Sequence, residues 1–313
     1  MHSKAIAVTD NIFGLYLHLP EREWLSLPAL TLRKNGRAVA ELPEIKLLSP
    51  LMSYLLWPFR IIFTLYAVIT FIVLMLFFFP FIVIASFWGK VKGGNFVYHL
   101  LRIWSAIWLP ITGIFHRNIY ESKPDKRQQY IFLVNHISYL DSAIIVEAIK
   151  QPFRPLGKVE MSRIPVFGFI YSVCVVKVNR SNADNRAKSI RQLKSVLKKG
   201  ISILVFPEGT FNETNEPLAT FYDGAFRVAI ETQTPIQPVL FLDTFDRMHY
   251  SNIFTLTPGR SRAVFLKPVE VNGLTQRDLR DLKEKVFNSM EQKLVEYNVS
   301  WINRKELINK QIN

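Results

Sequence analysis

The sequence contains almost no cysteine, since Cys174 is the only one in 313 residues. One cysteine excludes an intrachain disulfide and a zinc site built on several cysteines. Acidic residues are also scarce: 25 Asp and Glu stand against 39 Lys and Arg, for a formal net charge of +14. This excess favours anionic partners, among them lipid headgroups, nucleic acid, phosphorylated substrates and acidic carrier proteins.

Disordered chains contain few hydrophobic residues, and this sequence does not share that property. Hydrophobic residues make up 49% of the chain, and 24 residues are Phe. This composition excludes a disordered or collagen-like chain. We find no internal repeat and no long linker, and the length suits one large domain with or without a small appendage.

Charged residues are absent from the 28-residue stretch 61–88. A bilayer span needs about 20 apolar residues, and this stretch begins too far along the chain for a secretory signal peptide. A buried helix of a soluble core is the alternative, and it fits so long a run less well. We therefore predict a membrane-anchoring helical region at 49–120, between an extension of unknown role at 1–48 and the main domain at 121–313.

The geometry of the anchor is open. The apolar stretch 51–88 would extend about 57 Å as one helix, more than a hydrocarbon core of about 30 Å, and Pro80 can kink or break it. Basic residues flank both ends almost equally, so a single span and a re-entrant hairpin with both ends cytoplasmic both fit. A second apolar segment, 98–115, contains Arg102 and Pro110 and is predicted to be an interfacial or core helix.

From about residue 125, short apolar runs alternate with helix-like stretches. This alternation predicts an α/β fold, a mostly parallel open sheet with flanking helices, preceded by the hydrophobic membrane helix or helical hairpin. A final packing helix is expected at 275–297, with its apolar residues on one face. The expected strands are 130–134, 174–178, 202–206, 238–242 and 263–267, with a further one at 37–42 in the extension.

The first candidate site is the segment 135–141, NHISYLD. His136 follows the predicted strand 130–134, and open α/β sheets form their sites at the carboxyl ends of strands. A turn entering a helix can bring the carboxylate of Asp141 to the imidazole, and a His held in this way can take a proton from a hydroxyl. Alone the spacing is a weak signal, because a capping Asp and an unrelated His produce the same pattern.

The second candidate site is the segment 206–210, FPEGT, directly after the predicted strand 202–206. Gly209 lets the backbone approach a ligand closely. Glu208 offers acceptor oxygens and Thr210 offers a hydroxyl. The alternative is a simple turn at the end of a strand.

Together, His136-x4-Asp141 and the FPEGT segment resemble the glycerolipid acyltransferase family, the family of the bacterial 1-acylglycerol-3-phosphate acyltransferases. Two further blocks are similar, 157–180 and 224–239. The four blocks stand in the family's order, and the resemblance covers about 125–270.

The resemblance implies that His136 deprotonates the acceptor hydroxyl while Asp141 orients His136. The oxygen then attacks the thioester of acyl-CoA or acyl-carrier protein, with no cofactor, no metal and no enzyme-bound acyl intermediate. Ser138 can be read as a nucleophile, but its place inside the turn favours a structural or acceptor-binding role. The residues expected to contact the acceptor or shape its pocket are Asn135, Ser138, Lys158, Arg180, Glu208, Gly209 and Thr210.

Two positions depart from the family's phosphate-acceptor pattern, which often has Arg and Lys where this chain has Phe211 and Asp223. Lys158, Arg180 and Arg227 are candidates to supply the missing charge. The first hypothesis is acylation of 1-acylglycerol-3-phosphate to phosphatidate. The alternatives are acylation of another lysolipid, such as a lysophospholipid or an amino-acid-containing lysolipid, and a non-catalytic membrane lipid-binding protein.

The segment 186–199 carries six basic residues and no acidic one. It predicts either a solvated helix face or a contact with anionic headgroups, CoA phosphates or an acidic carrier protein. We do not expect a nucleic-acid partner, because the membrane segment and the acyltransferase motifs account for the charge. The expected location is the cytoplasmic face of the inner (plasma) membrane.

Overall fold

The computed structural model describes residues 33–34, 37–38, 44–178 and 183–302, and the chain divides into two compact units, 1–62 and 63–313. In the first unit, strands β1 (Arg33–Lys34) and β2 (Arg37–Ala38) pair antiparallel. The strand predicted at 37–42 is described only at 37–38, and its remainder lies outside the described residues. Helix α2 (Glu44–Ser86) begins in the first unit and continues into the second.

The second unit contains a seven-stranded sheet. All neighbouring strands run parallel except β8 and β9, so β3 and β9 run opposite to the other five. The mostly parallel sheet predicted from the sequence is therefore confirmed. In order across the sheet the strands are β3 (Ile114–Tyr120), β9 (Gly259–Phe265), β8 (Ile236–Phe241), β4 (Ile131–Val134), β7 (Ser202–Val205), β5 (Phe153–Lys158) and β6 (Val176–Val178).

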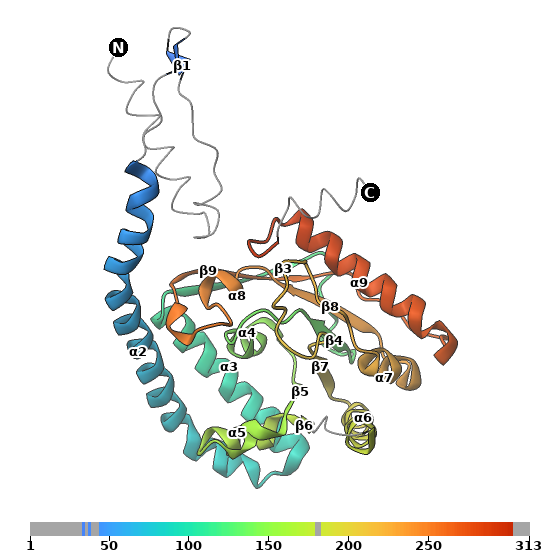
Figure 1. Cartoon of the computed structure of the whole chain (residues 1–313). Coiled ribbons are helices and arrows are strands. Elements are labelled where there is room, and N and C mark those ends of the chain that lie inside the picture. Colours follow the sequence, from blue (N-terminus) through green and yellow to red (C-terminus); the bar gives the residue numbers. More distant parts are fainter. Residues whose placement is uncertain (1–32, 35–36, 39–43, 179–182, 303–313) are drawn as a thin grey trace. The chain divides into compact units, whose positions relative to one another are not determined.

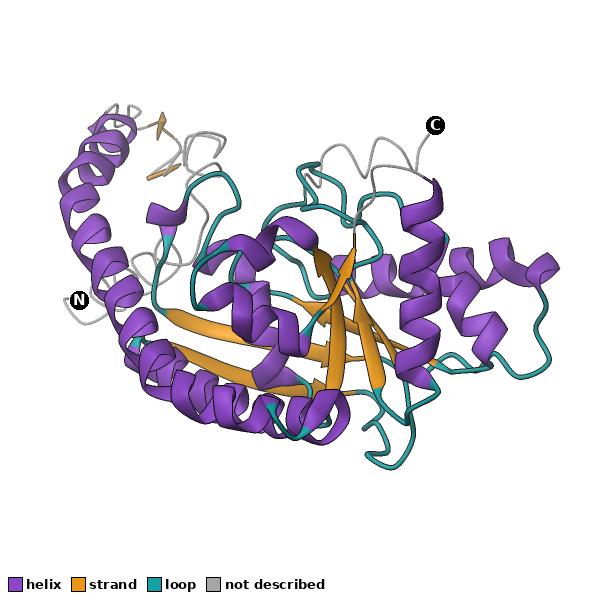
Figure 2. Cartoon of the chain, turned by 90° about the horizontal axis from the view of Figure 1, so that it is seen from below, coloured by secondary structure: helices purple, strands orange, loops and turns teal. Residues whose placement is uncertain are grey.

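Helices cover both faces of this sheet (Figure 2). On the central strand β4, Phe132 and Val134 enter the core shared with α3 and α4, whereas Ile131 and Leu133 enter the core shared with α6, α7 and α9. Successive side chains of a strand point to opposite faces, so an unbroken apolar run is buried on both. The helices of this unit are α3 (Gly94–Ile111), α4 (Asp141–Ala148), α5 (Phe167–Cys174), α6 (Ala183–Leu197), α7 (Gly224–Thr232), α8 (Thr244–Arg247) and α9 (Leu279–Glu296).

Helix α2 pairs antiparallel with α3, after a π-helical turn at Gly89–Gly93. Phe71 packs edge-on against Trp104, with ring centroids 4.8 Å apart, and the indole N–H of Trp108 donates to the Ala67 carbonyl at 3.0 Å. Residues 57–86 are long and apolar enough to cross a membrane, with a mean hydropathy of 3.0. Figure 1 shows the two helices side by side. Pro80 does not interrupt α2.

The helix predicted at 98–115 is wrong at its carboxyl end. Helix α3 stops at Ile111, and Gly113 adopts a φ of 64°, a left-handed conformation that suits glycine. The chain then enters β3, which the sequence analysis missed because His116, Arg117 and Asn118 break its apolar pattern. Strand β5 was missed as well, since its sequence FRPLGK contains proline and glycine.

The packing of α9 on the sheet predicts that replacing two neighbouring residues by Ala has very different effects on stability. Leu294 is fully buried whereas Val295 is exposed. We expect Leu294→Ala to lower the free energy of unfolding by about 2–5 kcal/mol, because it leaves a cavity. The matched control Val295→Ala should change it by less than about 0.5 kcal/mol. Denaturant unfolding in detergent micelles measures both, and equal losses in the two variants would contradict this packing.

Candidate active site

The site begins where β4 ends, at the buried side chain of Asn135. Its amide donates to the carbonyl of Phe241 at 3.1 Å and accepts from the Phe241 N–H at 2.7 Å. Phe241 is the last residue of β8, so the Asn135 side chain takes over backbone pairing where the ladder between β4 and β8 stops. This pair fixes the point at which the chain leaves the sheet and turns.

The turn is held by Asp141, the first residue of α4, which is fully buried. Its Oδ2 atom lies 2.8 Å from His136 Nδ1 and accepts the backbone N–H groups of Ile137 at 2.9 Å and Ser138 at 3.0 Å. A carboxylate is also favoured in the first turn of a helix. Because Nδ1–H donates to the carboxylate, the tautomer is fixed and Nε2 presents its lone pair.

Aromatic rings surround the imidazole of His136, whose side chain is 20% exposed. Phe206 stacks on it at 4.0 Å and 15°, and Phe211 lies 4.3 Å away at 57°. Phe211 in turn contacts Tyr139 at 4.7 Å and faces Tyr250 at 6.4 Å. The ring is therefore held between apolar walls while part of it stays accessible to a substrate.

Glu208 ties the second motif to the first and is only 2% exposed. Its Oε1 accepts the backbone N–H of His136 at 2.9 Å, and its Oε2 accepts the N–H of Ala219 at 2.8 Å. Burial raises the pKa of this carboxyl to about 7; the two hydrogen bonds oppose that shift and the charge of Asp141 adds to it. Both oxygens are thus engaged by the backbone beside the imidazole.

Ser138 is similarly engaged. Its hydroxyl donates to the Met248 carbonyl at 2.5 Å and accepts the Leu140 N–H at 3.0 Å. This geometry holds the turn against the segment 248–257. Because the Ser138 hydroxyl already makes two hydrogen bonds within the protein, a structural role suits it better than that of a nucleophile. In the second motif, Gly209 has a φ of 74° and Thr210 is exposed.

Two basic residues, Lys158 and Arg180, were predicted to contact the acceptor. Lys158 is exposed at the carboxyl end of β5, on the same edge of the sheet as the end of β4. Arg180 lies outside the described residues. The sequence analysis missed Phe206 and Phe211 as neighbours of His136, and Tyr250 as a neighbour of Phe211. No spacing signal links Tyr250 to a motif more than a hundred residues earlier.

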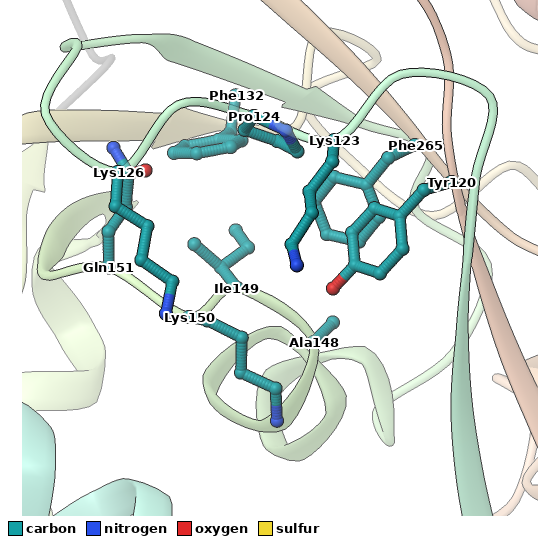
Figure 3. Close-up of a pocket in the computed structure, with 10 residues that line it drawn as sticks. All are labelled: Tyr120, Lys123, Pro124, Lys126, Phe132, Ala148, Ile149, Lys150, Gln151 and Phe265. Atoms are coloured by element: carbon teal, nitrogen blue, oxygen red, sulfur yellow. The ribbon is translucent and has the colours of Figure 1, made fainter.

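A pocket of about 180 Å³ lies at the opposite edge of the sheet. Figure 3 shows the side chains of Lys123, Lys126 and Lys150 around it, with the apolar side chain of Ile149 between them. Lys150 is paired with Glu147 at 2.7 Å, near the carboxyl end of α4. Neither member of the His136–Asp141 pair lines this pocket, so it is separate from the candidate active site.

The raised pKa of Glu208 predicts a specific pH dependence of stability. Its folded pKa of about 7 exceeds the ordinary 4.5, so its stabilising contribution is fully present below about pH 4.5 and is lost as the pH rises through about 7. The shift corresponds to roughly 3 kcal/mol at most. We expect Glu208→Gln to remove this decline in the free energy of unfolding between pH 4.5 and 7. The substitution should also lower the free energy of unfolding at every pH, because it places an amide NH2 group against a backbone N–H.

Urea unfolding of both proteins across this pH range provides the measurement. Glu213→Gln, an exposed carboxyl of the same loop, is the matched control and should retain the wild-type slope. Parallel curves for wild type and Glu208→Gln would contradict the raised pKa.

Comparison with known proteins supports an assignment. The family model described as Acyltransferase matches residues 116–242, which include both motifs. Proteins named 1-acyl-sn-glycerol-3-phosphate acyltransferase are similar in Haemophilus influenzae, with 28% identity over 62% of this chain and 80% of the relative, and in Salmonella typhimurium, with 29% identity over 56% and 71%. A chloroplastic relative from Brassica napus is 28% identical over 72% of this chain.

The matches span 63% and 54% of the length of two plant relatives, from Brassica napus and Arabidopsis thaliana. The crystal structure of the 1-acyl-sn-glycerophosphate acyltransferase PlsC from Thermotoga maritima shares the fold, with a TM-score of 0.63 over 78% of this chain and 98% of that chain, at 21% identity. The family match over residues 116–242, the relatives and the two motifs agree: this part of the chain is similar to the glycerolipid acyltransferases.

Proposed function

We propose that the chain is an O-acyltransferase of phospholipid synthesis. It transfers a fatty acyl group from acyl-CoA or acyl-carrier protein to the free hydroxyl of a lysolipid, and 1-acylglycerol-3-phosphate is the first candidate acceptor. The observation that carries the proposal is the 2.8 Å contact between His136 Nδ1 and the buried carboxylate of Asp141. The names of the relatives support the choice of acceptor.

The proposed reaction follows from this pair. His136 Nε2 takes the proton of the acceptor hydroxyl as its oxygen bonds to the thioester carbonyl carbon, and Asp141 stabilises the imidazolium. The tetrahedral intermediate then collapses, the C–S bond breaks, and the proton on His136 passes to the leaving thiolate. The acyl group moves directly to the acceptor, so the proposal needs no acyl-enzyme, no cofactor and no metal.

We propose that the protein acts at a membrane, on the cytoplasmic face of the inner membrane. Residues 57–86 of α2 support this placement through their length and hydropathy. The acceptor is itself an amphiphile that resides in lipid, so an enzyme anchored there meets its substrate in two dimensions. The acyl donor would arrive from the aqueous side.

A second candidate acceptor is a zwitterionic or amino-acid-containing lysolipid. Phe211 occupies the position of a frequent family Arg and lies against His136 and Tyr139. Asp223, at the position of a frequent family Lys, is paired with Lys283 at 2.6 Å. An aromatic side chain at a position where the family often has Arg suits an ammonium headgroup through cation–π attraction.

His136→Ala should lower turnover by about 100-fold or more, because it removes the general base. The matched control is His99→Ala, an exposed histidine of α3 that should retain wild-type turnover. Transfer of a labelled acyl group to a lysolipid in detergent micelles provides the measurement. A His136→Ala protein with most of its activity would contradict the proposed mechanism.

An acceptor panel tests the substrate assignment. With one labelled acyl donor, we expect lysophosphatidate to be acylated faster than lysolipids with a choline, ethanolamine or amino-acid headgroup, in line with the relatives. The reverse order would assign the second candidate and give Phe211 and Asp223 a role in specificity. No transfer to any lysolipid would overturn the proposed function.

A further inference from the structure

Three large apolar side chains are exposed on the segment between β5 and β6. This segment comprises a 3₁₀ helix, η2 (Val159–Arg163), and α5. Met161, Ile164 and Phe169 are 39%, 45% and 41% exposed. Single exposed apolar residues are ordinary, but three in nine residues form a patch of the kind that marks an interaction surface.

The backbone that carries Met161, Ile164 and Phe169 is tightly folded. Val166 adopts a φ of 61°, which β-branched residues rarely adopt. The Gly168 N–H donates to the Ile164 carbonyl at 2.6 Å, and a Cβ at Gly168 would lie 2.3 Å from the Ser162 carbonyl oxygen. The segment is therefore a tightly wound, preformed surface.

This patch continues the exposed apolar surface of α2. The Phe169 ring packs edge-on against Phe79 of α2, with centroids 5.7 Å apart. Leu76 and Ile72, three and seven residues before Phe79 and so close to the same face of the helix, are also exposed. Figure 1 shows α5 beside the carboxyl-terminal half of α2. A lipid phase in contact with this part of α2 therefore also meets α5.

Basic side chains accompany the apolar patch. Lys158, Arg163 and Lys177 are exposed, and none forms an ion pair within the described part of the chain, whereas Glu160 is the one acidic residue of the segment. Apolar side chains flanked by cations are suited to a bilayer surface with anionic headgroups. We infer that the segment 159–174, with Lys158, is a second membrane contact, in which Met161, Ile164 and Phe169 enter the lipid and the basic residues meet headgroup phosphates.

The strand register places this contact beside the catalytic pair. Leu133 of β4 lies beside Val205 of β7, and Leu204 lies beside Pro155 of β5. Counting along these parallel strands, His136 is level with the start of η2, two strand spacings or about 10 Å to the side. The contact thus holds the catalytic edge at headgroup depth. The inference concerns where the protein touches lipid and does not depend on acyl transfer.

Site-specific fluorescence tests the inference on the full chain. Cys174 is the only cysteine and is buried, so Cys174→Ala gives a background for single labels. An environment-sensitive fluorophore would be placed at Met161→Cys or Ile164→Cys. Phe77→Cys on α2 is the positive control, and Ser289→Cys, exposed on α9, is the negative control. Vesicles of phosphatidylcholine and phosphatidylglycerol in equal amounts would carry nitroxide-labelled acyl chains.

We expect the labels at 161 and 164 to be quenched by the nitroxide lipids like the label at 77, and the label at 289 to stay unquenched. Labels at 161 and 164 that behave like the one at 289 would overturn the inference. So would labels shielded from aqueous iodide but not quenched by lipid, because a second copy of the chain would then cover the patch.

A charge-insertion variant gives a separate readout. Met161→Glu with Ile164→Glu should lower acylation of acceptors in vesicles by about tenfold while activity in micelles stays within about twofold. Equal loss in both systems would contradict a membrane role. Absence of acyl transfer in the wild-type chain would refute the proposed function but leave the fluorescence result intact.

Discussion

One carboxylate oxygen, Oδ2 of Asp141, determines the geometry of the site. It lies 2.8 Å from His136 Nδ1 and accepts two backbone N–H groups of the turn that leads from β4 to α4. Each buried donor left unsatisfied costs about 1–3 kcal/mol, so the three contacts together hold both the turn and the ring. The same atom therefore shapes the backbone and orients the imidazole of the proposed general base, so the geometry of the site is inseparable from the local fold.

The sheet determines where this turn lies. Strands β4, β7 and β5 are parallel, so their carboxyl ends bring the His136 turn, the Glu208 loop and η2 to one edge. Asn135 joins this edge to β8, and Glu208 joins it to Ala219 through backbone N–H groups. The site is thus assembled from segments far apart in the sequence, each held by buried hydrogen bonds.

Features that depend on a local sequence pattern could be predicted from the sequence. The strand before His136 was evident from its apolar run, and the His-x4-Asp spacing suggested a carboxylate within reach of the imidazole. The contacts of Glu208 with His136 and Ala219 were not predictable, because they depend on how β7 is placed beside β4. Strands β3 and β5 were missed since their polar, proline and glycine residues obscure the pattern. The sequence left open whether Pro80 interrupts the apolar helix, and α2 continues through it.

Residues 63–86 of α2 share one hydrophobic core with α3, α4 and the sheet. Phe71 packs on Trp104, and Phe79 on Phe169, so this part of α2 is held against α3 and α5. The proposed membrane helix and the proposed catalytic edge therefore belong to one packed unit. The aromatic wall around His136 is a feature that only the folded chain brings together.

The central claim is direct acyl transfer, with His136 as base and no covalent intermediate. Its most direct test follows thiol release from an acyl thioester, with and without a lysolipid acceptor, together with mass spectrometry of the protein. Thiol release that depends on the acceptor and unmodified protein throughout are the predicted results. An initial burst of thiol without acceptor, with an acylated chain, would contradict the account.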